Sequence, residues 1–237
     1  MNNIKLFFLA IIFTISCISA KTNILQNVSN IPVFDTLRFQ KIVIEGEGRF
    51  FISVTQSNQD KLEINASKDL LDLITITNQG NCLIIKGEMS LSKYKKQIDI
   101  NIKVKNLNSI DLKKGMKTEN LVSHNNPTSI KFENVLSGDS LKINGEGKVL
   151  LTGNLHYNYV QIKNSGILKC DLAGHAKSLY LNIDGMGTFK ANDLEVINGL
   201  FDVNGITKIK INQVKYAKIN ANGIHYINTS VNFDINI

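Results

Sequence analysis

Apolar and polar residues alternate with a period of two along most of the chain. Clear examples cover residues 98–104, 141–143, 181–183, 209–211 and 231–237. Strands of this kind present one apolar and one polar side, so the pattern predicts sheet with a single buried face. Helical periodicity is weak, and its best candidate, residues 67–73, is predicted to be a turn or a single helical turn. The chain is therefore predicted to be all-β.

A short alternating phrase that ends in Gly or Asn returns five times in the second half. Its corner positions are Gly145, Asn164, Gly185, Gly205 and Gly223, which are 19, 21, 20 and 18 residues apart. A weaker copy covers residues 42–48. Self-similarity at about 20 residues is typical of stacked repeats. Gly and Asn suit the sharp corners of such a stack because both accept a positive φ.

These features predict a parallel β-solenoid with about 20 residues per coil. Residues 30–140 are strand-rich but less regular, and we interpret them as irregular coils that cap one end of the same solenoid. A local hairpin is expected at residues 78–81. An antiparallel barrel or sandwich of ten-residue strands fits the period too. It is disfavoured because the strong turn signal occurs only once per repeat.

Polar residues recur just before the corners of the predicted coils. Stacking of the coils is expected to align them into hydrogen-bonded ladders, and ordinary turn propensity is the alternative explanation. The residues concerned are Asn144, Asp184, Asn204 and Asn222.

The N-terminus has the layout of an export signal. Lys5 precedes an uncharged apolar run, residues 6–18, which ends near the small residues Ser19 and Ala20. This predicts a Sec signal peptide over residues 1–20, with a short membrane anchor as the alternative. Cleavage before Lys21 gives simple secretion, whereas lipidation at Cys17 is the competing outcome. The expected organisation is a linker at 21–33 and one domain at 34–237, located in the periplasm, on the outer membrane surface or outside the cell.

The basic charge of the chain changes this picture little. Its 27 basic and 20 acidic residues give a formal net charge of +7. Only Arg38 and Arg49 are arginines, and the lysines are spread along the sequence. Nucleic-acid binders use arginine for bidentate contacts, so no nucleic-acid partner is expected. A mild attraction for anionic polymers or lipid headgroups is expected instead.

Two cysteines remain beyond the signal peptide, Cys82 and Cys170, both in apolar strand-like stretches. An exported chain allows them to pair. Their surroundings favour two small buried hydrophobes, and the pairing stays open.

Several phrases resemble the bacterial auto-transporter adhesin head, or GIN, domain family. They are Phe39 to Gly48 with Gly46, the stretch 66–76, the turn at Gly80 followed by Leu83-Ile84-Ile85, and the successive Gly-bearing coils. The resemblance covers about residues 34–230 and implies a right-handed β-helix in the cell envelope. Departures are Asn164, Thr207 and His225, which replace glycines of the family pattern. The family brings no catalytic residues that could be assigned here.

Chemical motifs are sparse. Carboxylates do not recur in phase along one face, and there is no P-loop, Rossmann, nucleophile-elbow or zinc motif. The histidines, at positions 124, 156, 175 and 225, lack partners at the spacings of metal ligands. No catalytic residue, cofactor or metal site is predicted.

Aromatic residues provide the candidate ligand face. Tyr157 and Tyr159 lie in one coil, and Tyr180, Tyr216 and Tyr226 lie at broadly similar points of later coils. Stacked aromatics can hold sugar rings or peptide, and the alternative is that they fill corners beside the core.

The sequence thus predicts a non-enzymatic binding module or adhesin for polysaccharide, lipid headgroups or envelope protein. The alternatives are a scaffold or homo-oligomer that assembles through the terminal strand, residues 231–237, and a carbohydrate-active β-helix enzyme.

Overall fold

The computed structural model describes residues 38–88, 91, 96–113 and 127–229. It also gives the strand pairing of β1 (Asn23–Ile24), β2 (Val33–Phe34) and β12 (Asp234–Asn236). The described chain is strand apart from short helical turns, of which α2 (Lys68–Leu71) falls in the predicted segment. This confirms an all-β protein. Over the described residues, no helix combines the length and apolarity that a membrane crossing requires.

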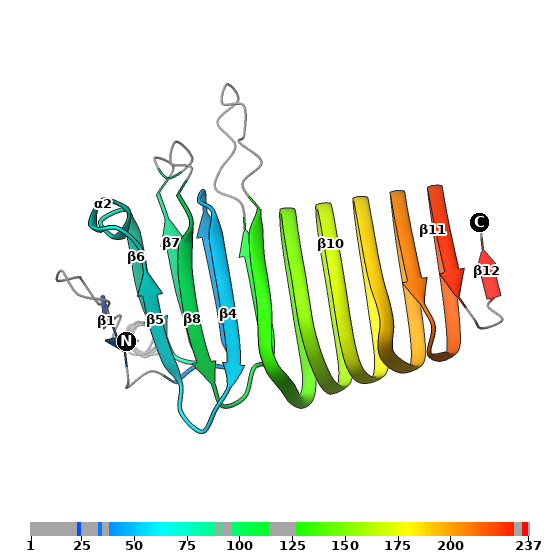
Figure 1. The fold of residues 1–237 in the computed structure, drawn as a ribbon, viewed down its shortest axis with the longest axis horizontal. Helices are drawn as coiled ribbons and strands as arrows, with labels where there is room; N and C mark the ends of the chain where they lie inside the picture. The colour runs from blue at the N-terminus through cyan, green and yellow to red at the C-terminus, as the bar shows by residue number, and fades with distance from the viewer. Residues whose placement is uncertain are drawn as a thin grey trace, which may run out of the picture.

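All the strands join one mixed, curled sheet. The remaining strands are β3 (Lys41–Gly46), β4 (Phe50–Gln56), β5 (Lys61–Asn65), β6 (Ile74–Gln79), β7 (Cys82–Gly87), β8 (Ile98–Val104), β9 (Ser109–Lys113), β10 (Thr128–Ile211) and β11 (Val214–Thr229). Figure 1 shows β10 as a series of neighbouring passes that bend at the edge of the sheet and continue without a break.

The C-terminal half is stacked in parallel through glycine corners. Gly205 of β10 lies opposite Gly223 of β11, and the same register continues to both ends of the pair. Earlier glycines repeat this contact, so that Gly147, Gly166, Gly185, Gly205 and Gly223 form a continuous corner column. We call the stretch from one corner glycine to the next a rung. Each glycine has a positive φ, and a Cβ on Gly205 would collide with the carbonyl oxygen of Gly185. Only glycine fits such a corner.

The predicted corners at Gly145 and Asn164 are wrong by two residues. The second glycine of each phrase, Gly147 or Gly166, occupies the corner, and the true spacings are 19, 19, 20 and 18. Asn164 is instead an inward residue, 3% exposed, beside Gly145 of the preceding rung. The reason is steric, since the backbone of the next rung approaches the corner too closely for any Cβ. None of the described non-glycine residues has a positive φ.

The core is built from inward columns that run the length of the stack. One such column contains Leu83, Ile42, Ile110, Ile143, Ile162, Leu181, Phe201 and Ile219, all buried. Strand registers join its ends, for example Ile42 with Leu83 and Ile110, and Phe201 with Ile219. Each fully buried side chain stabilises the fold by about 1.5–3 kcal/mol relative to exposure. The period-two alternation of the sequence therefore identifies the buried face correctly.

The N-terminal half belongs to the same sheet but is not stacked in chain order. Strand β9 lies between β3 and β10, and β4 lies between β8 and β10. Antiparallel strands complete the end of the sheet (Figure 1), where β6 pairs with β7 and β5 pairs with β8. The β6–β7 pair turns at Gly80, which confirms the predicted hairpin.

Candidate functional site

A polar groove crosses the rungs on the outward side of the sheet, just before the corner column. Its two rows of side chains come from alternate positions of successive rungs: Asp111, Asn144, Lys163, Asn182, Asp202 and Asn220 in one row, and Lys113, Glu146, Ser165, Asp184, Asn204 and Asn222 in the other. The groove consists of two shallow hollows of about 470 and 490 Å³ that share Asn182 and Asp184.

Hydrogen bonds join equivalent positions of neighbouring rungs within the groove. Asn204 Nδ2 donates to Asp184 Oδ1 at 3.1 Å, and Asn222 Nδ2 donates to Asn204 Oδ1 at 3.4 Å. In the other row, Asn220 Nδ2 donates to Asp202 Oδ1 at 2.6 Å. Parallel strands place these residues about 4.8 Å apart, so an amide reaches the next rung. Each amide and carboxylate keeps further donor or acceptor capacity for a ligand.

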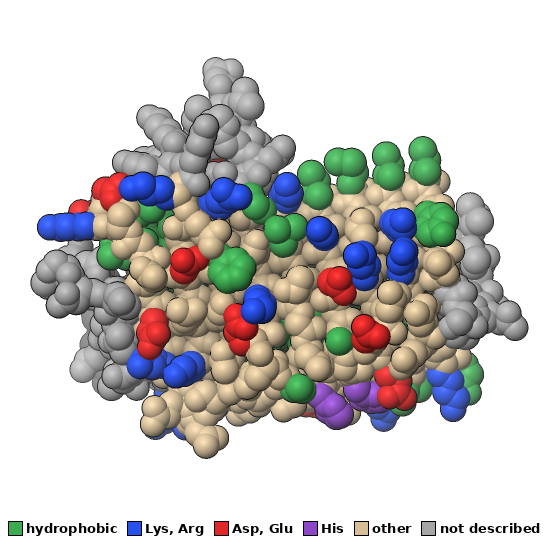
Figure 2. Space-filling model, in the orientation of Figure 1, with side chains coloured by type: hydrophobic (Ala, Val, Ile, Leu, Met, Phe, Trp, Pro, Cys, Tyr) green, Lys and Arg blue, Asp and Glu red, His purple; other side chains and the backbone are tan. Residues whose placement is uncertain are grey.

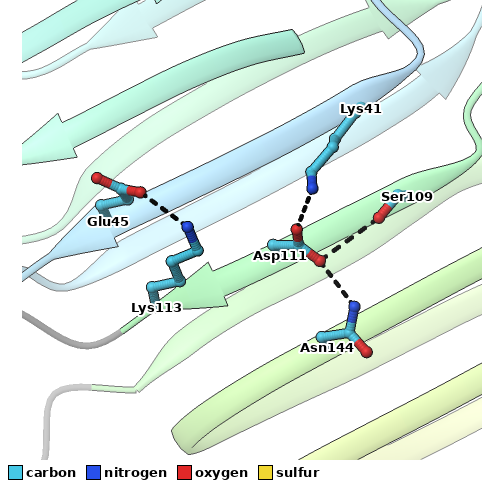
Figure 3. Close-up of polar contacts among 6 residues, drawn as sticks. All are labelled: Lys41, Glu45, Ser109, Asp111, Lys113 and Asn144. Carbon is cyan, nitrogen blue, oxygen red and sulfur yellow. Dashed lines mark hydrogen bonds and ion pairs between the residues drawn. The ribbon is translucent and has the colours of Figure 1, made fainter.

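The N-terminal end of the groove is closed by an ion-pair network around Asp111 (Figure 3). Asp111 contacts Lys41 Nζ at 2.5 Å, Asn144 Nδ2 at 2.8 Å and Ser109 Oγ at 3.4 Å. Burial raises the pKa of the Asp111 carboxyl, but hydrogen bonds from Lys41 and Asn144 outweigh it and hold the pKa below its ordinary value. This end of the groove is therefore structural, because its charges are already paired.

Tyr180 lies beside the middle of the groove. The Lys163 ammonium is 5.5 Å from the centre of its ring, a cation–π arrangement. The pKa of the Tyr180 hydroxyl is raised, first by desolvation and then by its hydrogen bond with the Asp202 carboxylate. Tyr180 thus combines an apolar ring face with amide and carboxylate neighbours at one point of the groove.

The structure does not unite the five predicted aromatics. Tyr157 is 1% exposed, and its hydroxyl donates to the Leu107 carbonyl at 3.1 Å, so its assignment to a ligand face is wrong. It occupies an inward position of its rung. Tyr159 and Tyr180 are half-buried, whereas Tyr216 and Tyr226 are 60% and 56% exposed. Tyr226 follows the corner column and therefore lies on the opposite side of the corner from the groove.

Stacking brings together histidines that are distant in the sequence. The rings of His156 and His175 are 5.3 Å apart, and His175 Nδ1 lies 3.4 Å from Glu195 Oε2. His156 and His175 are 19 positions apart, and His175 and Glu195 are 20 positions apart. Both separations equal the rung period, so the repeat in the sequence could have predicted these contacts. His225 Nδ1 lies 2.6 Å from Thr207 Oγ1. His124 is outside the described residues, within which no group of three or more His, Cys, Asp or Glu could hold a metal ion.

The two cysteines of the domain are free. Cys170 is buried, as expected of a small hydrophobe, and Cys82 is half-buried. Burial raises the pKa of both thiols. Cys17 is outside the described residues.

An all-β chain with parallel rungs and repeated glycine corners belongs to the class of repeat-built β proteins. The family model described as "Putative auto-transporter adhesin, head GIN domain" matches residues 38–230, and the chain belongs to this family. The resemblance inferred from the sequence is thereby confirmed.

The crystal structures that share the fold include two putative adhesins. A "putative adhesin" from Bacteroides fragilis is 21% identical, with 87% of this chain and 95% of that chain covered and a TM-score of 0.63. A "putative adhesin" from Parabacteroides distasonis is 15% identical, with 87% and 92% covered and a TM-score of 0.55. Comparison with curated proteins gives no match.

Proposed function

We propose that this protein is a non-enzymatic adhesion module that binds polysaccharide in the polar groove. The observation that carries the proposal is the double row of amide and carboxylate side chains across successive rungs. Sugar hydroxyls both donate and accept hydrogen bonds, and Asn and Asp side chains supply the complementary groups. A shallow open groove that repeats with each rung suits an extended polymer better than a small molecule.

The proposal includes a finer description of the fold. The chain forms a right-handed parallel β-helix with about 20 residues per coil and a less regular N-terminal half, in a single domain over residues 34–237. The parallel register of β10 and β11 and the spacing of the corner glycines support this winding. A helix of this kind gives every coil the same outward face, so a binding row lengthens with each repeat.

The proposal places the protein in the cell envelope or outside the cell. Residues 1–20 act as a signal peptide and 21–33 as a linker, both suggested by the sequence alone. Mass spectrometry of the processed N-terminus tests this. A chain that begins at Lys21 supports simple secretion, a diacylated Cys17 supports the lipoprotein alternative, and an unprocessed Met1 contradicts export by this signal.

A glycan array followed by calorimetry tests the groove. The processed protein is expected to bind a defined polysaccharide with an affinity that persists at physiological salt. The double variant Asn204→Ala with Asn222→Ala, and separately Tyr180→Ala, should each weaken binding about tenfold, the loss of about one good polar or stacking contact. Tyr226→Ala, which removes an exposed aromatic on the other side of the corner, is the matched control. Unchanged affinity in both groove variants would overturn the assignment.

A second candidate function is assembly through the C-terminal edge. Strand β12 pairs with residues 218–220 of β11, whereas residues 224–229 pair with β10 and with no other described strand. Ala221 and Ile227 are only partly buried at this end. An unpaired strand can accept another chain. If the protein forms an oligomer that dissociates when residues 230–237 are deleted, the scaffold function is favoured over the groove.

A further inference from the structure

An exposed apolar ridge follows the corner of the stack, one residue beyond the corner column. It consists of Ile167, which is half-buried, and of Met186, Ile206 and Ile224, the last two side by side on paired rungs. Met186, Ile206 and Ile224 are 49%, 53% and 71% exposed. Figure 2 shows hydrophobic side chains in a row along this edge, over β10 and β11. A continuous aliphatic row on the surface marks a contact site, since scattered single residues are the norm.

A basic strip borders the ridge on one side. The strip is formed by the outward residues two and four positions after each ridge residue, and Lys148 extends it at the N-terminal end. Its charged members are five lysines and one acid: Lys148, Lys169, Lys190, Lys208, Lys210 and Asp171. Figure 2 shows Lys and Arg side chains gathered below the hydrophobic row. Lys208 lies 5.0 Å from the ring centre of Tyr226, so this strip also carries an exposed aromatic.

The other side of the ridge is polar and weakly acidic. The outward positions just before the corner column are Glu146, Ser165, Asp184, Asn204 and Asn222, with two acids and no lysine. The ridge therefore separates a cationic strip from the polar groove. Aliphatic residues with cations on one flank match a surface that is anionic outside and apolar beneath.

We propose that the ridge and the basic strip dock the protein onto an anionic lipid bilayer. The four aliphatic side chains enter the boundary between headgroups and acyl chains, and the lysines contact lipid phosphates. Tyr226 is suited to the same depth because its ring is apolar and its hydroxyl is polar. Neighbouring rungs are about 4.8 Å apart, so the four ridge side chains follow one another over about 15 Å, and Figure 2 shows hydrophobic side chains in a row along this edge. The docking is independent of polysaccharide binding, since it uses the other side of the corner.

The charge pattern favours a bilayer over a second copy of the chain. A symmetric dimer through the ridge would use the same surface on both subunits. With the two-fold axis along the ridge, each basic strip would face only the two acids of the partner's groove side, and with the axis across the ridge the two basic strips would meet. Repulsion between like charges would oppose that contact. An anionic headgroup layer complements the same lysines.

A single tryptophan at the ridge gives a direct readout, because the chain contains no Trp. In the processed protein, Ile206→Trp is expected to shift its fluorescence to shorter wavelength with phosphatidylglycerol-containing vesicles and not with phosphatidylcholine alone. Tyr216→Trp serves as the matched control, since residue 216 is equally exposed but lies eight residues before the ridge residue Ile224 on the same strand. An unshifted Ile206→Trp spectrum with anionic vesicles, or the same shift in both variants, would overturn the proposal.

Vesicle co-sedimentation measures the two parts of the surface separately. The double variant Ile206→Ser with Ile224→Ser should lower the partition coefficient at least tenfold, and Lys169→Gln with Lys190→Gln about tenfold at low salt. Tyr216→Ser should partition like the unmodified protein. Equal binding by the Ile double variant contradicts the proposal. A dimer in sedimentation velocity that the same variant dissociates would assign the ridge to a second copy instead.

Discussion

The buried side chain of Asn164 occupies the space that a side chain on Gly145 would need, since a Cβ there would lie 2.6 Å from Asn164 Oδ1. Both polar atoms of the Asn164 amide lack a hydrogen-bond partner within the described protein. The two residues lie in adjacent rungs of one inward column, so a bulky residue in one rung accompanies a glycine in the other.

A double-mutant cycle tests this relationship. Gly145→Ala alone should lower the free energy of unfolding by about 1–3 kcal/mol because the methyl group overpacks the core. In an Asn164→Ala background the same change should cost clearly less, with a residual cost from Val149, whose Cγ2 lies 2.9 Å from the position of that methyl group. Denaturant unfolding gives all four stabilities. Equal costs in the two backgrounds would show that the residues are not coupled.

Tyr157 should make stability fall at high pH. Burial raises the pKa of its hydroxyl to about 12, above the value of about 10 expected in the unfolded chain. The folded state therefore retains the proton while the unfolded state loses it, and the contribution present below pH 10 is lost between about pH 10 and 12. Its size is about 2–3 kcal/mol.

The control for this effect is Tyr157→Phe. Loss of the hydrogen bond to Leu107 should lower stability by about 1 kcal/mol at neutral pH. The same variant should decline less steeply between pH 10 and 12 than the unmodified protein. Parallel declines would show that other groups cause the alkaline loss.

Asp111 should make stability fall at low pH. Because hydrogen bonds from Lys41 and Asn144 lower the pKa of its carboxyl despite burial, the contribution is present above the unfolded value of about 4 and is lost as pH falls through the folded value. Asp111→Asn should cost about 1–3 kcal/mol at neutral pH and flatten the acid limb of the stability profile. Asp139→Asn, at an exposed carboxylate, is the matched control. An unchanged acid limb in Asp111→Asn would contradict this role.

The corner column should tolerate no substitution. Gly205→Ala forces a side chain into a positive φ of 119° and against the Gly185 carbonyl, and we expect a loss of about 3 kcal/mol or more. Gly80→Ala is the control, since Gly80 also has a positive φ but a Cβ there would meet no described atom within 4 Å. Its expected cost is about 1 kcal/mol. Thermal unfolding gives the stability loss of each variant. The loss in Gly80→Ala reports backbone strain alone, and the loss in Gly205→Ala reports backbone strain together with the collision against the Gly185 carbonyl.

The sequence predicts which residues point into the core better than it predicts which residue of each phrase lies at the corner. Alternation identifies Ile143, Ile162 and Leu181 as inward residues because burial of one face is a local property of each strand. The corner register depends on contact between rungs, and each phrase offers two candidate positions, such as Gly145 and Gly147. Only the close approach of the next rung distinguishes them. The repeat alone predicts the Asp184–Asn204–Asn222 ladder correctly, but Asn144, which it assigns to the same ladder, lies in the other row and donates to Asp111. For Tyr157 the ligand-face prediction is wrong, and the alternative of a position beside the core is correct.

The placement of β9 between β3 and β10 has a consequence for the order of folding. Lys41 pairs with Ser109, a separation of 109 − 41 = 68 residues, and Phe51 pairs with Ser129, a separation of 129 − 51 = 78. Gly205 and Gly223 are separated by 223 − 205 = 18. Closing the long loops costs more chain entropy, so we expect the N-terminal half to close more slowly than the C-terminal rungs. Once it has closed, each later rung elongates a finished template by one local step, in the direction in which the ribosome makes the chain.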